Sequence, residues 1–133
     1  MANPLQSCGH AAVDMGEEEF TSGRPHPMID NSLRVRRLLQ EARDPQVAVI
    51  VLDVVLGYGA HPDPVAEIGP AIQAARGEAA REGRSLPIVA SVTGTEKDPQ
   101  GLQHTLAGLE DTGAIVCDSN AAAARLAALL IQK

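Results

Sequence analysis

Aromatic side chains are almost missing from this chain, whose 133 residues include one phenylalanine, one tyrosine and no tryptophan. Its core must therefore be built from valine, isoleucine, leucine and alanine. That composition suits a parallel β-sheet covered by alanine-rich helices. The same scarcity argues against a flavin as ligand, because aromatic rings to flank an isoalloxazine ring are lacking.

Cysteine is scarce as well, with Cys8 and Cys117 as the only two in the sequence. Two cysteines give neither a disulfide framework nor a zinc-ligand pattern, and both suit a reducing, cytoplasmic compartment. We expect Cys117 to be a small buried hydrophobic residue at the end of a strand.

Long apolar runs and a basic surface are also absent. The longest apolar run, residues 47–56, contains Asp53 and is far too short to span a membrane. Residues 1–9 have neither the basic nor the apolar region of a signal peptide. The net charge of −6 argues against nucleic acid as a partner, because binding a phosphate backbone needs a basic surface. Basic residues do gather on one predicted helix, where we expect a solvated face: Arg34, Arg36, Arg37 and Arg43.

The chain does contain a regular alternation of strand-like and helix-like segments. Four strand–helix units joined by right-handed crossovers predict one α/β domain over residues 10–133, after a disordered lead-in or linker at 1–9. We expect a four- to five-stranded parallel sheet with helices on both faces. The predicted strands cover residues 10–15, 47–56, 86–92 and 114–117, and the helices cover 33–42, about 65–82, 98–112 and 121–132.

Two local patterns sharpen this prediction. Residues 47–56 form a nearly continuous β-branched run, which is typical of a central strand buried on both faces. Asp98 and Pro99 have the residue types of an N-cap and a first helical residue, so they predict the start of the third helix.

Glycines and small polar residues follow directly after each predicted strand. The carboxyl ends of parallel strands share one edge of the sheet, and open α/β sheets bind ligands outside that edge. The sequence therefore predicts a ligand site built from the four strand-end loops, which begin near Asp14, Gly57, Gly94 and Ser119.

These loops resemble those of a known family. The motifs are GRPHPMID at residues 23–30, LDVVLGYGAHPDP at 52–64, GTEKDPQ at 94–100 and SNAAAAR at 119–125. On them, the chain resembles the carboxyl-terminal CoA-ligase domain of the succinyl-CoA synthetase superfamily, and more closely the last domain of FdrA-type acyl-CoA synthetase-like proteins. The resemblance covers residues 10–133.

The resemblance implies a flavodoxin-like three-layer fold. It also implies a place beside a partner domain where acyl substrate, phosphate and phosphohistidine meet. The sequence has no ATP-grasp domain and no CoA-binding Rossmann domain, so CoA and ATP are expected only with partner domains or subunits, and activity alone is not expected. We interpret the chain as either a domain of a longer protein or a separate subunit. The stretch Gly9-His10-Ala11 leads into the first predicted strand and is taken as a chance likeness to a phosphohistidine motif.

The main candidates for binding an anion are Gly57, Gly59, His61, Gly94 and Thr95. Backbone N–H groups at helix starts are unpaired and favour negative charge, so two glycine loops that precede helices can hold a phosphate or a carboxylate. The alternative is that these glycines only satisfy tight turns with positive φ.

Arg24 and His26 lie between prolines that fix the local backbone. Arg24 can clamp a carboxylate or a phosphate through two parallel hydrogen bonds, or it can pair with an acid at residues 17–19. His26 is either part of this site or a turn residue.

Three aspartates are expected to support the site rather than to react. Asp53 lies in a strand predicted to be buried, so it needs a hydrogen-bonding partner, which we place in the loop at residues 24–30. Asp30 is expected to help cap the first helix, and Asp14 either to bind ligand or to cap its own loop. We assign no catalytic residue and no metal site.

The leading functional hypothesis is a ligand-binding and subunit-pairing domain of an acyl-CoA synthetase-like enzyme, which holds a small carboxylate or phosphate. The first alternative is a subunit of a carbamoyltransferase-like complex in allantoin or oxamate metabolism. The second is a non-enzymatic interaction module. A homo-oligomer formed through the alanine-rich last helix is left open.

Overall fold

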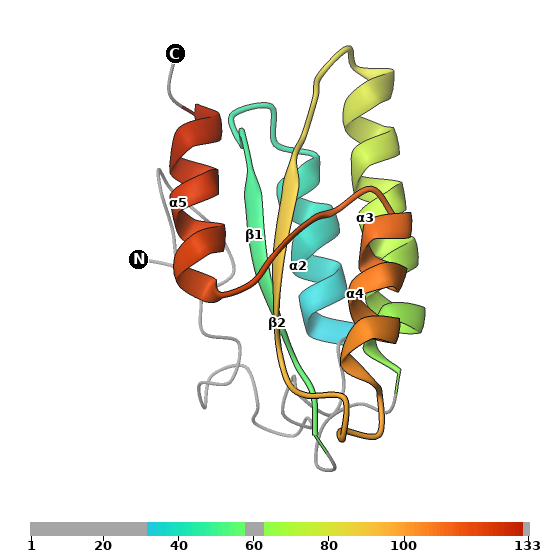
Figure 1. The fold of residues 1–133 in the computed structure, drawn as a ribbon. Coiled ribbons are helices and arrows are strands. Elements are labelled where there is room, and N and C mark those ends of the chain that lie inside the picture. The colour runs from blue at the N-terminus through green and yellow to red at the C-terminus, as the bar shows by residue number, and fades with distance from the viewer. Residues whose placement is uncertain (1–31, 58–62, 132–133) are drawn as a thin grey trace.

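The computed structural model describes residues 32–57 and 63–131, which form an α/β domain in three layers (Figure 1). The middle layer is a parallel sheet with the strand order β1–β2–β3. Its strands are β1 (Ile50–Val55), β2 (Ile88–Thr93) and β3 (Ile115–Cys117). The predicted α/β class with a parallel sheet is confirmed. The strand predicted at residues 10–15 lies outside the described residues.

Helices cover both faces of the sheet, as predicted. The helices are α2 (Ser32–Ala42), α3 (Pro64–Arg81), α4 (Leu102–Asp111) and α5 (Asn120–Ile131). Figure 1 shows α5 on one face of the sheet and α2, α3 and α4 on the other. Because the three strands follow one another across the sheet, crossovers of constant hand place α3 and α4 on the same face.

The main core lies between the sheet and the three-helix face. Even-numbered β2 residues, such as Ile88 and Ala90, point into it and are fully buried against Ile72 and Leu109. The opposite face of β2 carries the fully buried Val89, and α5 covers this side of the sheet. The core is aliphatic, as the missing aromatics require.

The prediction that residues 47–56 form a strand buried on both faces is wrong. The strand is shorter, Ile50–Val55, and lies at the end of the described strand order. Its α5 side is open, with Val51 45% exposed. The fully buried strand is β2, in which Thr93 alone is exposed. A β-branched composition fits both strands, so it does not distinguish them.

Glycines allow α3 and α4 to approach closely. A Cβ atom on Gly108 of α4 would lie 2.8 Å from Cγ1 of Val65 in α3. A Cβ on Gly69 of α3 would lie 3.1 Å from Cγ2 of Thr112, at the end of α4. The two helices are therefore in contact at positions where a larger side chain would separate them.

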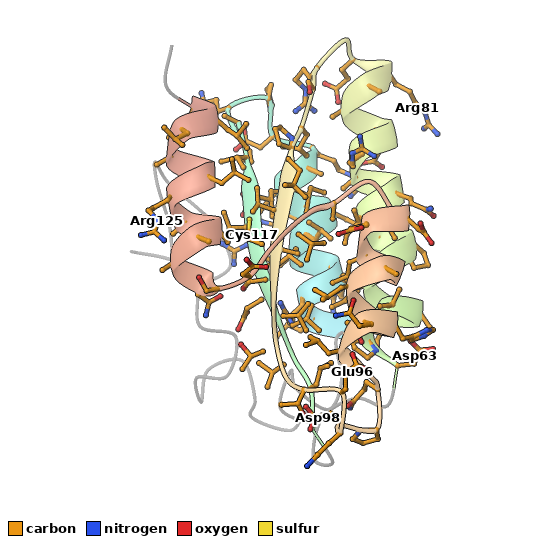
Figure 2. All side chains as sticks on the ribbon, in the orientation of Figure 1. Asp63, Arg81, Glu96, Asp98, Cys117 and Arg125 are labelled. Carbon is orange, nitrogen blue, oxygen red and sulfur yellow. The ribbon has the colours of Figure 1, made fainter. Side chains whose placement is uncertain are left out.

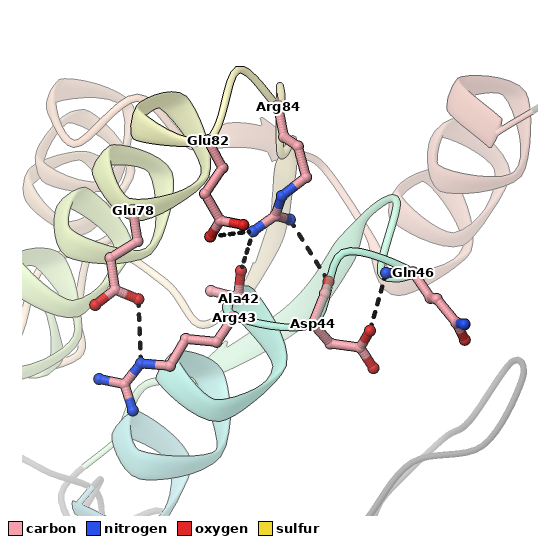
Figure 3. Close-up of polar contacts among 7 residues, drawn as sticks. All are labelled: Ala42, Arg43, Asp44, Gln46, Glu78, Glu82 and Arg84. Atoms are coloured by element: carbon pink, nitrogen blue, oxygen red, sulfur yellow. Dashed lines mark hydrogen bonds and ion pairs between the residues drawn. The ribbon is translucent and has the colours of Figure 1, made fainter.

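A guanidinium group joins α2 to the start of β2 at the amino edge of the sheet (Figure 3). Arg84 Nη2 donates to the carbonyl oxygen of Ala42 and to the Glu82 carboxylate, both at 3.0 Å. Its Nη1 reaches the carbonyl oxygen of Asp44 at 3.5 Å, and its buried Nε has no partner among the described residues. A cation at the end of α2 satisfies carbonyl groups that a helix leaves unpaired.

The arginines of α2 form a solvated face only in part. Arg36 is exposed, as predicted, and so is most of the Arg43 side chain. The side chains of Arg34 and Arg37 are largely buried, and they have carboxylate partners. Ion pairs among the described residues include Arg34–Asp53 and Arg37–Glu41 from this helix and Arg43–Glu78 just after its end.

None of the helices that the structure describes combines the length and the apolar character needed to span a bilayer.

Candidate functional site at the carboxyl edge of the sheet

The carboxyl ends of β1 and β2 lie at one end of the molecule, where the sequence places the site. Figure 2 shows Asp63, Glu96 and Asp98 at this end and Arg81 at the opposite one. The last hydrogen bond between the two strands is donated by the Leu56 N–H to the carbonyl oxygen of Thr93, at 2.8 Å. Gly57 and Gly94 follow immediately and begin the two loops.

Gln100 joins these loops beyond the end of the strands. Its Oε1 accepts from the Gly57 N–H at 3.1 Å, and its Nε2 donates to the Gly57 carbonyl oxygen at 2.8 Å. The side chain is buried, with the residue only 7% exposed. Gly57 has φ of +143°, a conformation that favours glycine. The Gly57 N–H therefore already has an acceptor within the protein.

Gly94 is a glycine for a different reason. Its φ is not positive, so no left-handed turn requires it. A Cβ atom there would lie 2.6 Å from the Cβ of Leu56, well inside van der Waals contact. No described group accepts the Gly94 N–H. Gly94 thus combines a close approach to Leu56 with a backbone N–H that has no acceptor among the described residues.

The segment after Gly94 forms a turn rather than the start of a helix. The Thr95 N–H donates to Asp98 Oδ2 at 2.6 Å, and the Asp98 N–H donates to the Thr95 carbonyl oxygen at 3.1 Å. The prediction that Asp98 and Pro99 begin the third helix is therefore wrong. Helix α4 begins at Leu102 after Gly101, which has φ of +75°. Asp98 caps a turn, a role for which aspartate has the same side-chain chemistry as for an N-cap.

Helices α3, α4 and α5 each have an internal acceptor for one of their first N–H groups at this edge. Asp63 accepts from Ala66 at the start of α3, at 3.2 Å. Ser119 accepts from Ala122 at the start of α5, at 3.1 Å. In α4, the Glu96 carboxylate accepts from the Gln103 N–H. The chain itself therefore uses some of the backbone N–H groups that the sequence predicted for binding a ligand. At α3 and α4 the acceptor is itself an anion.

Asp53 is not the buried aspartate that the sequence predicts. Its side chain is 56% exposed, and its partner among the described residues is Arg34 of α2. Arg34 Nη2 donates to the Asp53 carbonyl oxygen and lies 3.5 Å from Oδ1. Burial lowers the pKa of the Arg34 guanidinium, and the nearby Asp53 carboxylate acts in the opposite direction. The pair is structural and ties α2 to β1.

A row of polar residues crosses the sheet on the α5 side. Asp53, Ser91 and Cys117 occupy matching positions on the three strands. Ser91 is buried and donates its hydroxyl hydrogen to Oδ1 of Asn120, the first residue of α5. Cys117 is a free thiol of intermediate exposure, so the expectation of full burial is wrong. Sequence reasoning missed Ser91, because a lone serine in a predicted strand gives no signal of its partner.

Several predicted site residues lie outside the described residues. Within residues 32–57 and 63–131, no group of three or more His, Cys, Asp or Glu side chains is placed to hold a metal ion. His104 is exposed in the first turn of α4. Predicted residues on which the structure gives no information are Asp14, Arg24, His26, Asp30, Gly59 and His61.

These features define an α/β domain with flavodoxin-like architecture whose strand-end loops are fastened together at the carboxyl edge of the sheet. The family model described as CoA-ligase matches residues 3–130, and the chain belongs to this family. It is similar to the uncharacterized protein YahF of Escherichia coli strain K12, with 48% identity over 115 residues. That match covers 86% of this chain and 22% of YahF, so the chain spans about a fifth of the length of its curated relative.

Proposed function

We propose that this chain is the substrate-binding and subunit-pairing domain of an acyl-CoA synthetase-like enzyme of the FdrA type. It would hold the carboxylate or phosphate end of the substrate at the carboxyl edge of the sheet. The observation that carries the proposal is the match to the CoA-ligase family over residues 3–130. Partner domains or subunits would supply ATP and CoA.

The geometry supports a binding role at this edge. The Gly94 N–H has no acceptor among the described residues and follows directly after the buried strand β2. A backbone N–H in that position can donate to a carboxylate or phosphate oxygen without rearranging the fold. The Gly57 N–H, held by Gln100, acts instead as an anchor for its loop. Arg24 and His61 remain proposed contributors to the same site.

The carboxylates of the edge restrict which ligand fits. Glu96 and Asp98 lie in the loop that begins at Gly94, and Lys97 is the cation between them. An anion bound at the Gly94 N–H must approach these two negative charges, which disfavours a highly charged ligand. We therefore expect a monocarboxylate or a singly charged phosphate ester to bind better than a dianion, in the absence of partner domains.

The test is ligand-dependent thermal stability of the purified chain. A ligand that binds only the folded state stabilises it by about 2.7 kcal/mol at a hundred times its Kd. The ligands are phosphate, succinate, oxamate and carbamoyl phosphate. CoA and ATP are added with and without the partner domains. Stabilisation by a small acid or phosphate is the expected result, and a preference for carbamoyl phosphate over inorganic phosphate would favour the carbamoyltransferase alternative.

The control separates the site from general ion effects. Gly77→Ala adds a Cβ within α3 that would meet no atom within 4 Å, so it should leave the ligand-dependent change in thermal stability unchanged. Gly94→Ala should push Leu56 away from the loop after β2 and therefore reduce the ligand-dependent change in thermal stability. Absence of stabilisation by every ligand, also with partner domains present, would rule out the proposed function.

A further inference from the structure

We infer that Gln100 is a positioning residue that holds Gly57, at the end of β1, and the loop after β2 together as one unit. Its carboxamide donates to the carbonyl oxygen of Gly57 and accepts from the N–H of the same residue, at 2.8 and 3.1 Å. The two residues are 43 positions apart in the chain, so no local turn brings them together. The significance of this unit for ligand binding rests on the proposed function.

The pairing uses the full chemistry of the glutamine side chain. A carboxamide offers a donor and an acceptor side by side, which matches the N–H and C=O of one peptide residue. Leucine or methionine has comparable bulk but makes neither bond. Glutamate accepts from the N–H but cannot donate to the carbonyl while it is ionised. Few side chains can therefore replace Gln100 without opening the contact.

The surroundings make this contact decisive for the loop. Gly57 has φ of +143°, and Leu56, the residue before it, is in contact with Gly94. The Leu56–Thr93 hydrogen bond is the last one between the strands. Beyond it, the described contacts that hold Gly57 to the β2 side come from Gln100. Loss of Gln100 should release the loop while leaving the sheet intact.

The first test is hydrogen exchange of the Gly57 amide, measured by NMR. In Gln100→Leu its protection factor should fall about tenfold or more, whereas amides of β2 that face β1 keep theirs. The matched control is Gln103→Leu, a nearby glutamine exposed on α4, which should leave Gly57 protection unchanged. Unchanged Gly57 protection in Gln100→Leu would overturn the inference.

A conservative variant provides a readout that a purely structural role would not give. In Gln100→Glu, a protonated carboxyl can make both bonds to Gly57, and an ionised one cannot. Burial and bonding of the neutral form raise the pKa of the introduced carboxyl above the ordinary value of about 4.3. In the ionised form the second carboxylate oxygen would face the Gly57 carbonyl oxygen, and repulsion between these two oxygens should open the contact. Gly57 protection should therefore be lower at about pH 7.5 and recover towards the wild-type value at about pH 5. Failure to recover, with wild type measured at both pH values, would count against Gln100 as the positioning group.

The binding arm uses phosphate and succinate as probes, in isothermal titration with the partner domains present. Gln100→Leu should weaken binding about tenfold, and Gln100→Glu should bind better at acid pH than at neutral pH relative to wild type. If wild type binds neither probe, the proposed function fails, while the exchange measurements still decide the role of Gln100.

Discussion

Adding one methyl group at Gly94 should push apart the ends of β1 and β2. The new Cβ would lie 2.6, 2.7 and 2.8 Å from three carbon atoms of Leu56. Carbon atoms prefer a separation of about 3.5–4.0 Å, so each of these contacts is too short by about 1 Å. Rotating the Leu56 side chain relieves the two outer contacts but not the one to its Cβ, which is fixed to the backbone.

The expected cost follows from this geometry. Forcing a methyl group into a packed site costs about 1–3 kcal/mol, a sizeable part of the roughly 5–15 kcal/mol that stabilises a typical domain. Urea denaturation followed by far-ultraviolet circular dichroism measures the loss, since the chain has no tryptophan to report by fluorescence. We expect the midpoint of Gly94→Ala to fall with little change in slope.

Gly77→Ala is the matched control for the same chemical change. Gly77 lies within α3, and a Cβ there would meet no atom within 4 Å. Replacing a helical glycine by alanine should stabilise the protein by about 0.5–1 kcal/mol. The two variants should therefore shift the midpoint in opposite directions. A Gly94→Ala protein as stable as wild type would refute the packing argument.

Three further substitutions test other contacts, each by urea denaturation. Arg84→Met should destabilise the protein by about 1–2 kcal/mol, because the end of α2 loses its cation, although the variant also removes the buried Nε that has no partner. The control, Arg81→Met at an exposed position, should be nearly neutral, and equal effects of the two variants would contradict this account. Gly108→Ala should cost about 1–3 kcal/mol, and adding Val65→Ala should make its effect smaller than in the wild-type background, which a double-mutant cycle would reveal. Ser119→Ala should cost about 1 kcal/mol through loss of the N-cap of α5, and no loss would show that the cap is dispensable.

The fold was predictable because its signals are local. Alternating strand-like and helix-like segments define a parallel α/β sheet. Helix α4 ends before Gly113, whose φ of +94° is typical of a helix stop. The loop predicted to begin near Ser119 leads into α5, and the Ser119 hydroxyl accepts from the first turn of that helix. Each of these features depends on residues within one turn of one another.

The errors concern features that depend on distant parts of the chain. Asp98 has the same residue type whether it caps a helix or a turn, and only the structure shows its bond to Thr95. The burial of β1 depends on what covers the strand, which its composition does not specify. Gln100 belongs to a recognised motif, yet its partner Gly57 lies 43 positions away. The site was therefore predictable as an edge of the sheet, but not as a set of contacts.

The attachment of α5 has a consequence for how the domain opens. The buried residues of this helix are Ala123 and Ala127, which offer little apolar area to hold it on the sheet. The opposite layer is held by leucine and isoleucine side chains and by ion pairs. Local unfolding begins where the least area is buried. The domain should therefore open first by the detachment of α5, which would expose Val89 and Ser91 while the other layer stays folded.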